Sequence, residues 1–141
     1  MTRPERQPVD GDVSSVAELA ASARSLEKAG RLDETAALLE TRTETPTASP
    51  EILYRLGCVR ARQQRLAEAE TLLRRAIAAR QEDSRFHTNL GVVLDQLGRA
   101  EDAVRSFRRA LQLAPDDAVA LLNLGALYGE MRRYDDAARS L

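Results

Sequence analysis

The chain has 141 residues, of which 43% are hydrophobic, so it is long enough to bury a substantial core. Its formal net charge of −1 supplies no field that would select nucleic acid or an anionic membrane surface. It holds one cysteine, Cys58, and one histidine, His87, which excludes an internal disulfide and a multi-cysteine metal site. We therefore expect no cofactor, no metal and no nucleic-acid partner.

The first segment, 1–13, contains two prolines and several charges but no apolar run, so we expect a flexible lead rather than a secretory signal or an anchor. No stretch of the chain approaches the roughly 18 apolar residues of a membrane helix. These features predict a cytoplasmic protein without membrane insertion. Lys28 is the only lysine among 21 basic residues, which indicates a GC-rich, bacterial gene.

A Leu-Gly pair recurs every 34 residues, with its leucine at Leu56, Leu90 and Leu124. An arginine recurs in the same phase shortly after each pair. A fixed period of this length is typical of repeat architectures. We therefore divide the array, 16–141, into four copies: 16–49, 50–83, 84–117 and the truncated 118–141.

Each copy is predicted to form two helices, because apolar residues fall at helical spacing on both sides of one short break. The breaks are predicted near Gly30, Gln64, Gly98 and Arg132. Every second helix opens on acidic residues, which favour the positive end of the helix dipole. Between the first two copies, 41–50 is predicted to be a loose linker that ends at Pro50, a residue suited to the first turn of a helix.

Glycine inside a helix costs roughly 1 kcal/mol relative to alanine, so Gly57, Gly91 and Gly125 require a packing reason. The partner helices carry a small residue in the same phase, at Ala69, Ala103 and Ala137. Two small residues at one crossing let the helix backbones approach closely. One pair of helices cannot bury its apolar faces alone, so stacking is expected.

These residues resemble the tetratricopeptide repeat family, whose pattern is met in the third copy by Leu90-Gly91, Ala103, Phe107 and Pro115. The fourth copy adds Tyr128 at the aromatic position. The second copy departs from the pattern at Arg60 and Gln81, and in the first copy Ser22-Ala23 and Thr35 replace Leu-Gly and Ala. The resemblance implies an all-α, right-handed superhelical solenoid of helix-turn-helix repeats.

The resemblance also implies a binding role, with the first helices lining a concave groove that holds a peptide or protein segment. Four arginines there indicate an acidic partner, and Asn89 with Asn123 would form a ladder that grips a peptide backbone. The family's carboxylate clamp is doubtful, because Ala20 and Arg24 stand among its positions. Cys58 and Gln96 also fall on this face. The predicted peptide-binding residues are Arg24, Tyr54, Arg55, Arg62, Arg85, Asn89, Val92, Leu122 and Asn123.

Three functions remain open. The first is an adaptor or scaffold that binds a protein segment in the groove. The second is a regulatory or substrate-docking region of a longer enzyme, such as a protein glycosyltransferase. The third is a homo-oligomer that self-assembles through 118–141, where we expect an apolar surface that lacks full cover. The residues predicted to form that surface are Leu124, Leu127, Tyr128, Ala137, Ala138 and Leu141.

Overall fold

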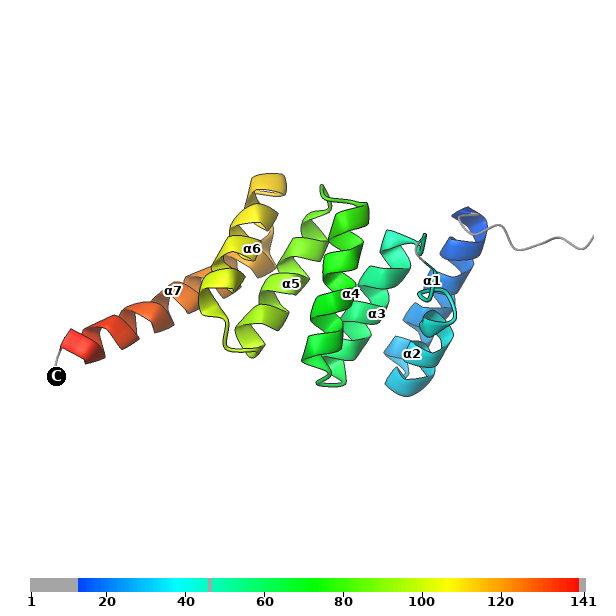
Figure 1. Ribbon diagram of the computed structural model, residues 1–141, viewed down its shortest axis with the longest axis horizontal. Helices are drawn as coiled ribbons and strands as arrows, with labels where there is room; N and C mark the ends of the chain where they lie inside the picture. Colours follow the sequence, from blue (N-terminus) through cyan, green and yellow to red (C-terminus); the bar gives the residue numbers. More distant parts are fainter. Residues whose placement is uncertain (1–12, 46, 140–141) are drawn as a thin grey trace, which may run out of the picture.

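The computed structural model describes residues 13–45 and 47–139, which form seven α-helices and contain no strand (Figure 1). The predicted lead, 1–13, lies outside the described residues except for Val13, the first residue of the first helix. The helices are α1 (Val13–Lys28), α2 (Leu32–Glu40), α3 (Pro50–Arg62), α4 (Leu66–Ala79), α5 (Ser84–Gln96), α6 (Ala100–Leu113) and α7 (Ala118–Arg139).

The first six helices form three antiparallel pairs, α1–α2, α3–α4 and α5–α6, which stand side by side along the long axis of the molecule (Figure 1). We call the side formed by α1, α3, α5 and α7 the first-helix face, and the side formed by α2, α4 and α6 the second-helix face. The core follows the stack, with Leu39, Leu73 and Phe107 fully buried in successive copies. Each pair therefore covers the apolar side of its neighbour, as repeat stacking requires.

The predicted turns at Gly30, Gln64 and Gly98 are confirmed, since these residues adopt φ values of 74°, 64° and 79°. After each of them the backbone N–H of the recurring arginine donates a hydrogen bond to a carbonyl five residues earlier in the chain. The N···O distance is 2.9 Å from Arg99 to Leu94. A left-handed residue followed by this bond is a common way to end an α-helix.

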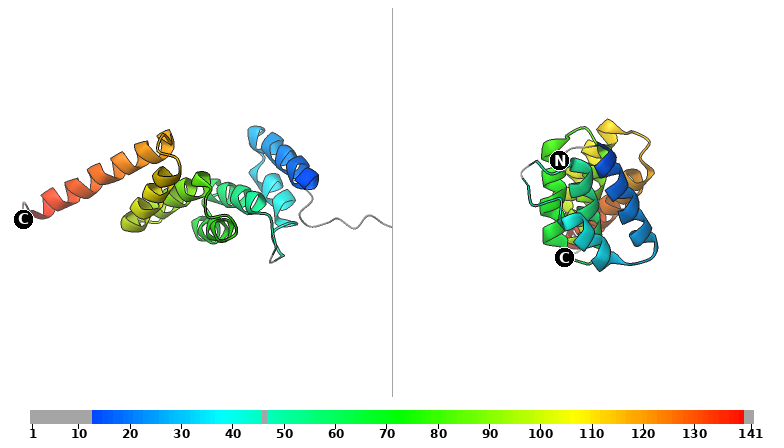
Figure 2. Two further views of the ribbon diagram at one scale, coloured as in Figure 1. Left: turned by 90° about the horizontal axis from the view of Figure 1, so that it is seen from above. Right: turned by 90° about the vertical axis from the view of Figure 1, so that its right-hand side faces the viewer.

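The turn predicted near Arg132 is wrong, because α7 continues as one helix through this position (Figure 2). Arginine adopts a left-handed conformation less readily than glycine, which occupies the same phase at Gly98. The segment after Arg132 is also short, and a short helix forms stably only when it packs on a neighbour. The C-terminal part of α7 instead extends away from α6.

The predicted close approach at the repeated glycines is confirmed at Gly57 and Gly91. A Cβ atom added at Gly91 would lie 2.7 Å from Cε1 of Phe107, and one added at Gly57 would lie 3.0 Å from Cγ of Leu73. At Gly125 the same prediction is wrong, because no described atom lies within 4 Å of an added Cβ. In the part of the chain that the structure describes, no second helix approaches α7 closely at this glycine.

Arg60, the departure from the repeat pattern in the second copy, is buried. Its guanidinium forms ion pairs with Glu40 of α2 and, at 3.2 Å, with Glu68 of α4. It also donates a hydrogen bond of 2.9 Å to Gln63. A charged side chain thus occupies a place that the pattern gives to an aromatic ring, and carboxylates on two neighbouring helices balance its charge.

The linker between the first and second copies is less loose than predicted, in the part that the structure describes. Nη2 of Arg75 in α4 donates a hydrogen bond of 3.0 Å to the carbonyl of Thr43. The Thr43 and Ala48 side chains are buried. The connection therefore packs on the second copy.

Candidate functional site

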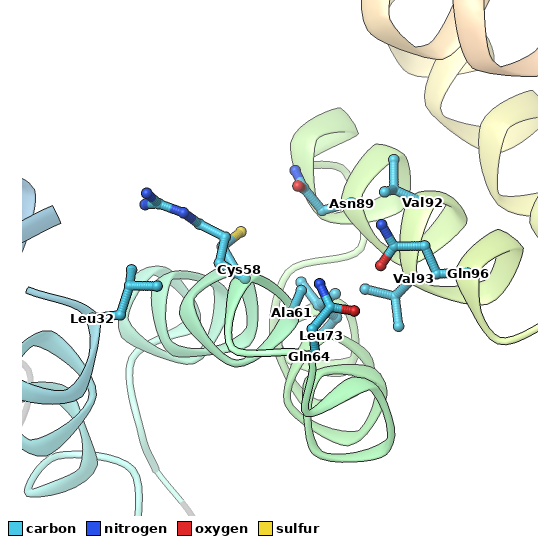
Figure 3. Close-up of a pocket in the computed structure, with 10 residues that line it drawn as sticks. Leu32, Cys58, Ala61, Gln64, Leu73, Asn89, Val92, Val93 and Gln96 are labelled. Atoms are coloured by element: carbon cyan, nitrogen blue, oxygen red, sulfur yellow. The ribbon is translucent and has the colours of Figure 1, made fainter. Parts of the chain in front are cut away.

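A hollow of about 470 Å³ opens on the first-helix face between α3 and α5 (Figure 3). The Cys58 side chain from α3 and the Asn89, Val92 and Gln96 side chains from α5 surround it. Its other lining residues come from α2, from α3 and the turn after it, from α4 and from α5, and most of them are apolar. They are Leu32, Ala61, Arg62, Gln64, Leu73 and Val93.

Three predicted site residues, Arg62, Asn89 and Val92, line this hollow together. The other six, Arg24, Tyr54, Arg55, Arg85, Leu122 and Asn123, do not line it. Sequence reasoning missed the floor, which includes Leu73 and Val93, because it considered the outward positions of the first helices alone. Both residues belong to the apolar stripes of the repeat and are buried, and only the packing of adjacent copies places them beneath the hollow.

Asn89 is held by two hydrogen bonds from its amide nitrogen. Nδ2 donates to the backbone carbonyl of Arg85 at 2.9 Å and to the Tyr54 hydroxyl at 3.2 Å. Both N–H groups are therefore engaged, and the side-chain oxygen remains as an acceptor. Asn123 makes the corresponding bond to the carbonyl of Val119 at 2.8 Å. The two asparagines thus share the expected phase, but Asn89 has only its side-chain oxygen left to offer a ligand.

Tyr54 lies beside the hollow in an aromatic and cationic cluster. Its ring centroid is 5.0 Å from that of Phe86, and the Arg85 guanidinium lies 5.0 Å from the Tyr54 ring centroid. Burial raises the pKa of Tyr54 above its ordinary range, so the hydroxyl remains protonated. Packing on both sides holds this ring in place and supports the hydroxyl that meets Asn89.

The predicted positive patch is largely neutralised by carboxylates on the same face. Arg85 contacts Asp83 at 2.7 Å and Glu51 at 2.9 Å, and its hydrogen bond lowers the pKa of Asp83. Arg55 pairs with Glu51 at 3.3 Å. Arg62 pairs with Glu27 at 3.6 Å, whereas Arg24 is exposed. Three arginines thus meet three carboxylates, and the face offers less free positive charge than its arginine count indicates.

Cys58 lies at the rim of the hollow and is half-buried. Desolvation by burial raises the pKa of its thiol to about 11. Because the thiolate is the reactive form, this environment suppresses nucleophilic chemistry near neutral pH.

Within residues 13–45 and 47–139, no three histidine, cysteine or acidic side chains gather in a way that could hold a metal ion. Among these residues there is also no helix with the length and apolar character needed to cross a membrane.

Comparison with solved structures finds the same architecture in several proteins. A crystal structure of MamA is 22% identical with a TM-score of 0.76, and the alignment covers 91% of this chain and 75% of that chain. The first TPR of Spaghetti (RPAP3), bound to the HSP90 peptide SRMEEVD, is 20% identical with a TM-score of 0.77, covering 89% and 99%. A mutant O-GlcNAc transferase from Thermobaculum terrenum is 26% identical with a TM-score of 0.75, covering 90% of this chain and 23% of that one.

Comparison with protein families gives the same assignment from sequence. Two profiles described as tetratricopeptide repeat match residues 54–118 and 96–141, which together span more than half of the chain. No curated protein matches the chain. The repeat pattern, the all-α solenoid and both family matches agree: the chain belongs to the tetratricopeptide repeat family.

Proposed function

We propose that this chain is a protein-interaction module that holds an extended peptide segment in the hollow between α3 and α5. The observation that carries the proposal is the lining of this hollow. The side-chain oxygen of Asn89 stands beside an apolar floor that includes Val93 and Leu73. An amide acceptor can bind a peptide N–H while an apolar side chain of the segment fills the floor.

The likeness to the first TPR of RPAP3, whose structure contains a bound HSP90 peptide, supports a peptide as ligand. The hollow should also discriminate between segments of different charge. Because Arg55, Arg62 and Arg85 already meet carboxylates, we expect only a modest preference for acidic over basic segments. That preference should fall as salt rises, since exposed charges are screened.

Selection of a displayed random peptide library against the chain tests the proposal. Selected peptides should protect Cys58, the only cysteine, from a thiol-reactive dye, because its side chain lines the hollow. Asn89→Ala should weaken their binding by about 1 kcal/mol, the usual worth of one hydrogen bond. Asn123→Ala is the matched control, since Asn123 shares the phase of Asn89 but lies on α7. Peptides that bind without protecting Cys58, and with equal losses in both variants, would contradict the assignment.

A second candidate is the docking region of a longer enzyme, which is favoured by the likeness to the Thermobaculum terrenum O-GlcNAc transferase. In that case the segment held in the hollow would belong to a substrate protein. The coding sequence beyond codon 141 decides this alternative: a glycosyltransferase reading frame supports it, and a stop codon removes it.

A third candidate is self-assembly through α7. Among the described residues, all the exposed large hydrophobic side chains belong to this helix: Val119, Leu121, Leu122, Tyr128 and Tyr134. The surface differs from the predicted one, because Leu127 is buried and Leu124 is half-buried, while Ala137 and Leu141 lie outside the described side chains. Exposed large apolar side chains gathered on one helix favour an interface.

Light scattering over a concentration series tests the third candidate. The unmodified chain should associate, and Leu122→Glu with Tyr128→Glu should shift it toward the monomer. Arg132→Glu on the same helix is a charge-changing control that leaves the apolar side chains in place. A chain that stays monomeric at high concentration ends this alternative.

A further inference from the structure

The second-helix face carries a hollow of its own, of about 330 Å³, between α4 and α6. Its walls bear three arginines: Arg74 from α4, and Arg105 and Arg109 from α6. Its floor includes the apolar Ile77 of α4 and Leu90 of α5, and the buried His87 and Ser106 complete it. We call it the basic hollow. It lies on the opposite side of the stack from the hollow described above.

The arginines around the basic hollow outnumber the carboxylates that pair with them. Arg74 and Arg99 share Glu70, at 2.8 and 2.9 Å. Arg99 and Arg105 share Asp102, at 2.9 and 3.2 Å. Arg109, in contrast, donates to the neutral side chain of Gln112 at 3.1 Å.

Four guanidiniums therefore meet two carboxylates, Glu70 and Asp102, which leaves an excess of two positive charges. Burial raises the pKa of Glu70, but the hydrogen bonds from Arg74 and Arg99 outweigh this effect and lower it, so the carboxylate stays ionised. On the first-helix face three arginines meet three carboxylates, and a fourth, Arg24, is exposed. The larger excess of arginines over paired carboxylates is thus around the basic hollow.

The guanidiniums retain free donors that can reach a ligand. Each guanidinium carries five N–H groups in a planar fork that matches a carboxylate. Arg105 contacts Asp102 through Nη1, and its side chain is 74% exposed. Arg74 contacts Glu70 through Nε. Most of their N–H groups are therefore available, and the exposed side chains can turn toward an anion over the hollow.

The floor adds a second requirement for the ligand. Ile77 is half-buried, Leu90 is buried, and Ala78 at the edge is exposed. A site of this size and lining suits an aliphatic side chain held between charged groups. No tyrosine, phenylalanine or tryptophan lines it, and its one aromatic ring, that of His87, is buried.

We propose that the basic hollow is a second binding site, which takes an acidic protein segment with an aliphatic side chain between carboxylates. The aliphatic group covers Ile77 and Leu90, and the carboxylates meet Arg105 and Arg109. The site is separate from the one between α3 and α5, so the solenoid holds two segments at once, one on each face.

Fluorescence anisotropy with a labelled peptide that alternates glutamate and leucine tests the proposal. Arg105→Gln with Arg109→Gln should weaken its binding about tenfold or more, because each change removes a charge-assisted contact. Arg108→Gln with Arg133→Gln is the matched control: it removes the same charge from exposed positions outside both hollows and should change affinity little. Ala78→Glu should also abolish binding, since it places a carboxylate at the edge. Circular dichroism verifies that each variant is folded.

Peptides with glutamine for glutamate, or serine for leucine, should each bind more weakly than the parent peptide. The peptide should leave the reaction of Cys58 with a thiol-reactive dye unchanged, which separates this site from the one between α3 and α5. Equal losses of affinity in the two double variants would show that the peptide responds only to the net charge of the protein, and would overturn the proposal. Equally tight, arginine-dependent binding of anionic vesicles or a single-stranded oligonucleotide would overturn the assignment to an acidic protein segment.

Discussion

The third and fourth copies of the repeat share the Asn-Leu-Gly phrase of their first helix but place it in different environments. In the third copy, α6 crosses α5 so closely that Phe107 lies against Gly91. In the fourth, α7 carries Gly125 in the same phase with no described atom within 4 Å of an added Cβ, and several of its large apolar side chains, such as Leu122 and Tyr134, are exposed. The same residue type is therefore a packing device in one copy and a helix-weakening residue in the other.

The difference teaches that a repeat motif specifies a contact only when its partner helix is present. Ala103 and Phe107 supply the small and bulky groups that make Gly91 useful. For Gly125 the corresponding residues would have to come from beyond a turn at Arg132, where α7 continues as one helix. The predictions below test this contrast, beginning with the largest expected effect.

Phe107→Ala should lower the free energy of unfolding by about 3–5 kcal/mol, because it removes a fully buried ring and leaves a cavity. Tyr134→Ala on α7 is the matched aromatic control, and its side chain is 77% exposed. It should change stability by no more than about 0.5 kcal/mol. Urea denaturation followed by circular dichroism measures both. A large loss for Tyr134→Ala would show that α7 is covered in solution.

Alanine at the three repeated glycines should have graded effects on stability. Gly91→Ala should cost about 1–3 kcal/mol, because the new methyl group meets the buried Phe107 ring. Gly57→Ala should cost less, since its contact with Leu73 is longer. Gly125→Ala should stabilise the protein by up to about 1 kcal/mol through helix propensity. Equal effects at Gly91 and Gly125 would remove the contrast between the copies.

The left-handed turn residues allow two smaller changes in stability, one a loss and the other a gain. Gly98→Ala should cost about 1 kcal/mol, because a side chain is unfavourable at a φ of 79°. Gln64→Gly should stabilise the second copy by a similar amount, since Gln64 already adopts a φ of 64°. Thermal unfolding of the two variants measures both shifts. A destabilised Gln64→Gly chain would show that the glutamine side chain contributes more than its backbone strain costs.

Cys58 provides a test that affects reactivity and leaves stability unchanged. Its pKa of about 11, against an ordinary 9.0, should lower the thiolate population near neutral pH about a hundredfold. Alkylation should therefore be slow and should accelerate as pH rises toward 11. A cysteine at the exposed Gln96 position, in a Cys58→Ala background, is the control and should react at the ordinary rate. Equal rates at both positions would contradict the burial of the Cys58 thiol.

Much of the site geometry depended on contacts that the sequence does not specify. The phase of Asn89 and Asn123 on the first-helix face was predictable, because helical periodicity sets which side a residue occupies. The bonds from Asn89 to Tyr54 and Arg85 were not, since they depend on how adjacent copies are spaced. The same holds for the pairing of Arg62 with Glu27, which joins α3 to α1.

The sequence by itself determined the period, the helical pairs and the turns at Gly30, Gln64 and Gly98, because these follow from local apolar spacing and from the backbone conformations that glycine favours. The tertiary structure alone decided that α7 remains one helix, that the arginines of the first-helix face are neutralised, and that the excess positive charge lies around the basic hollow. These features depend on distances between side chains from different copies. A local pattern cannot contain that information, since identical phrases meet different neighbours.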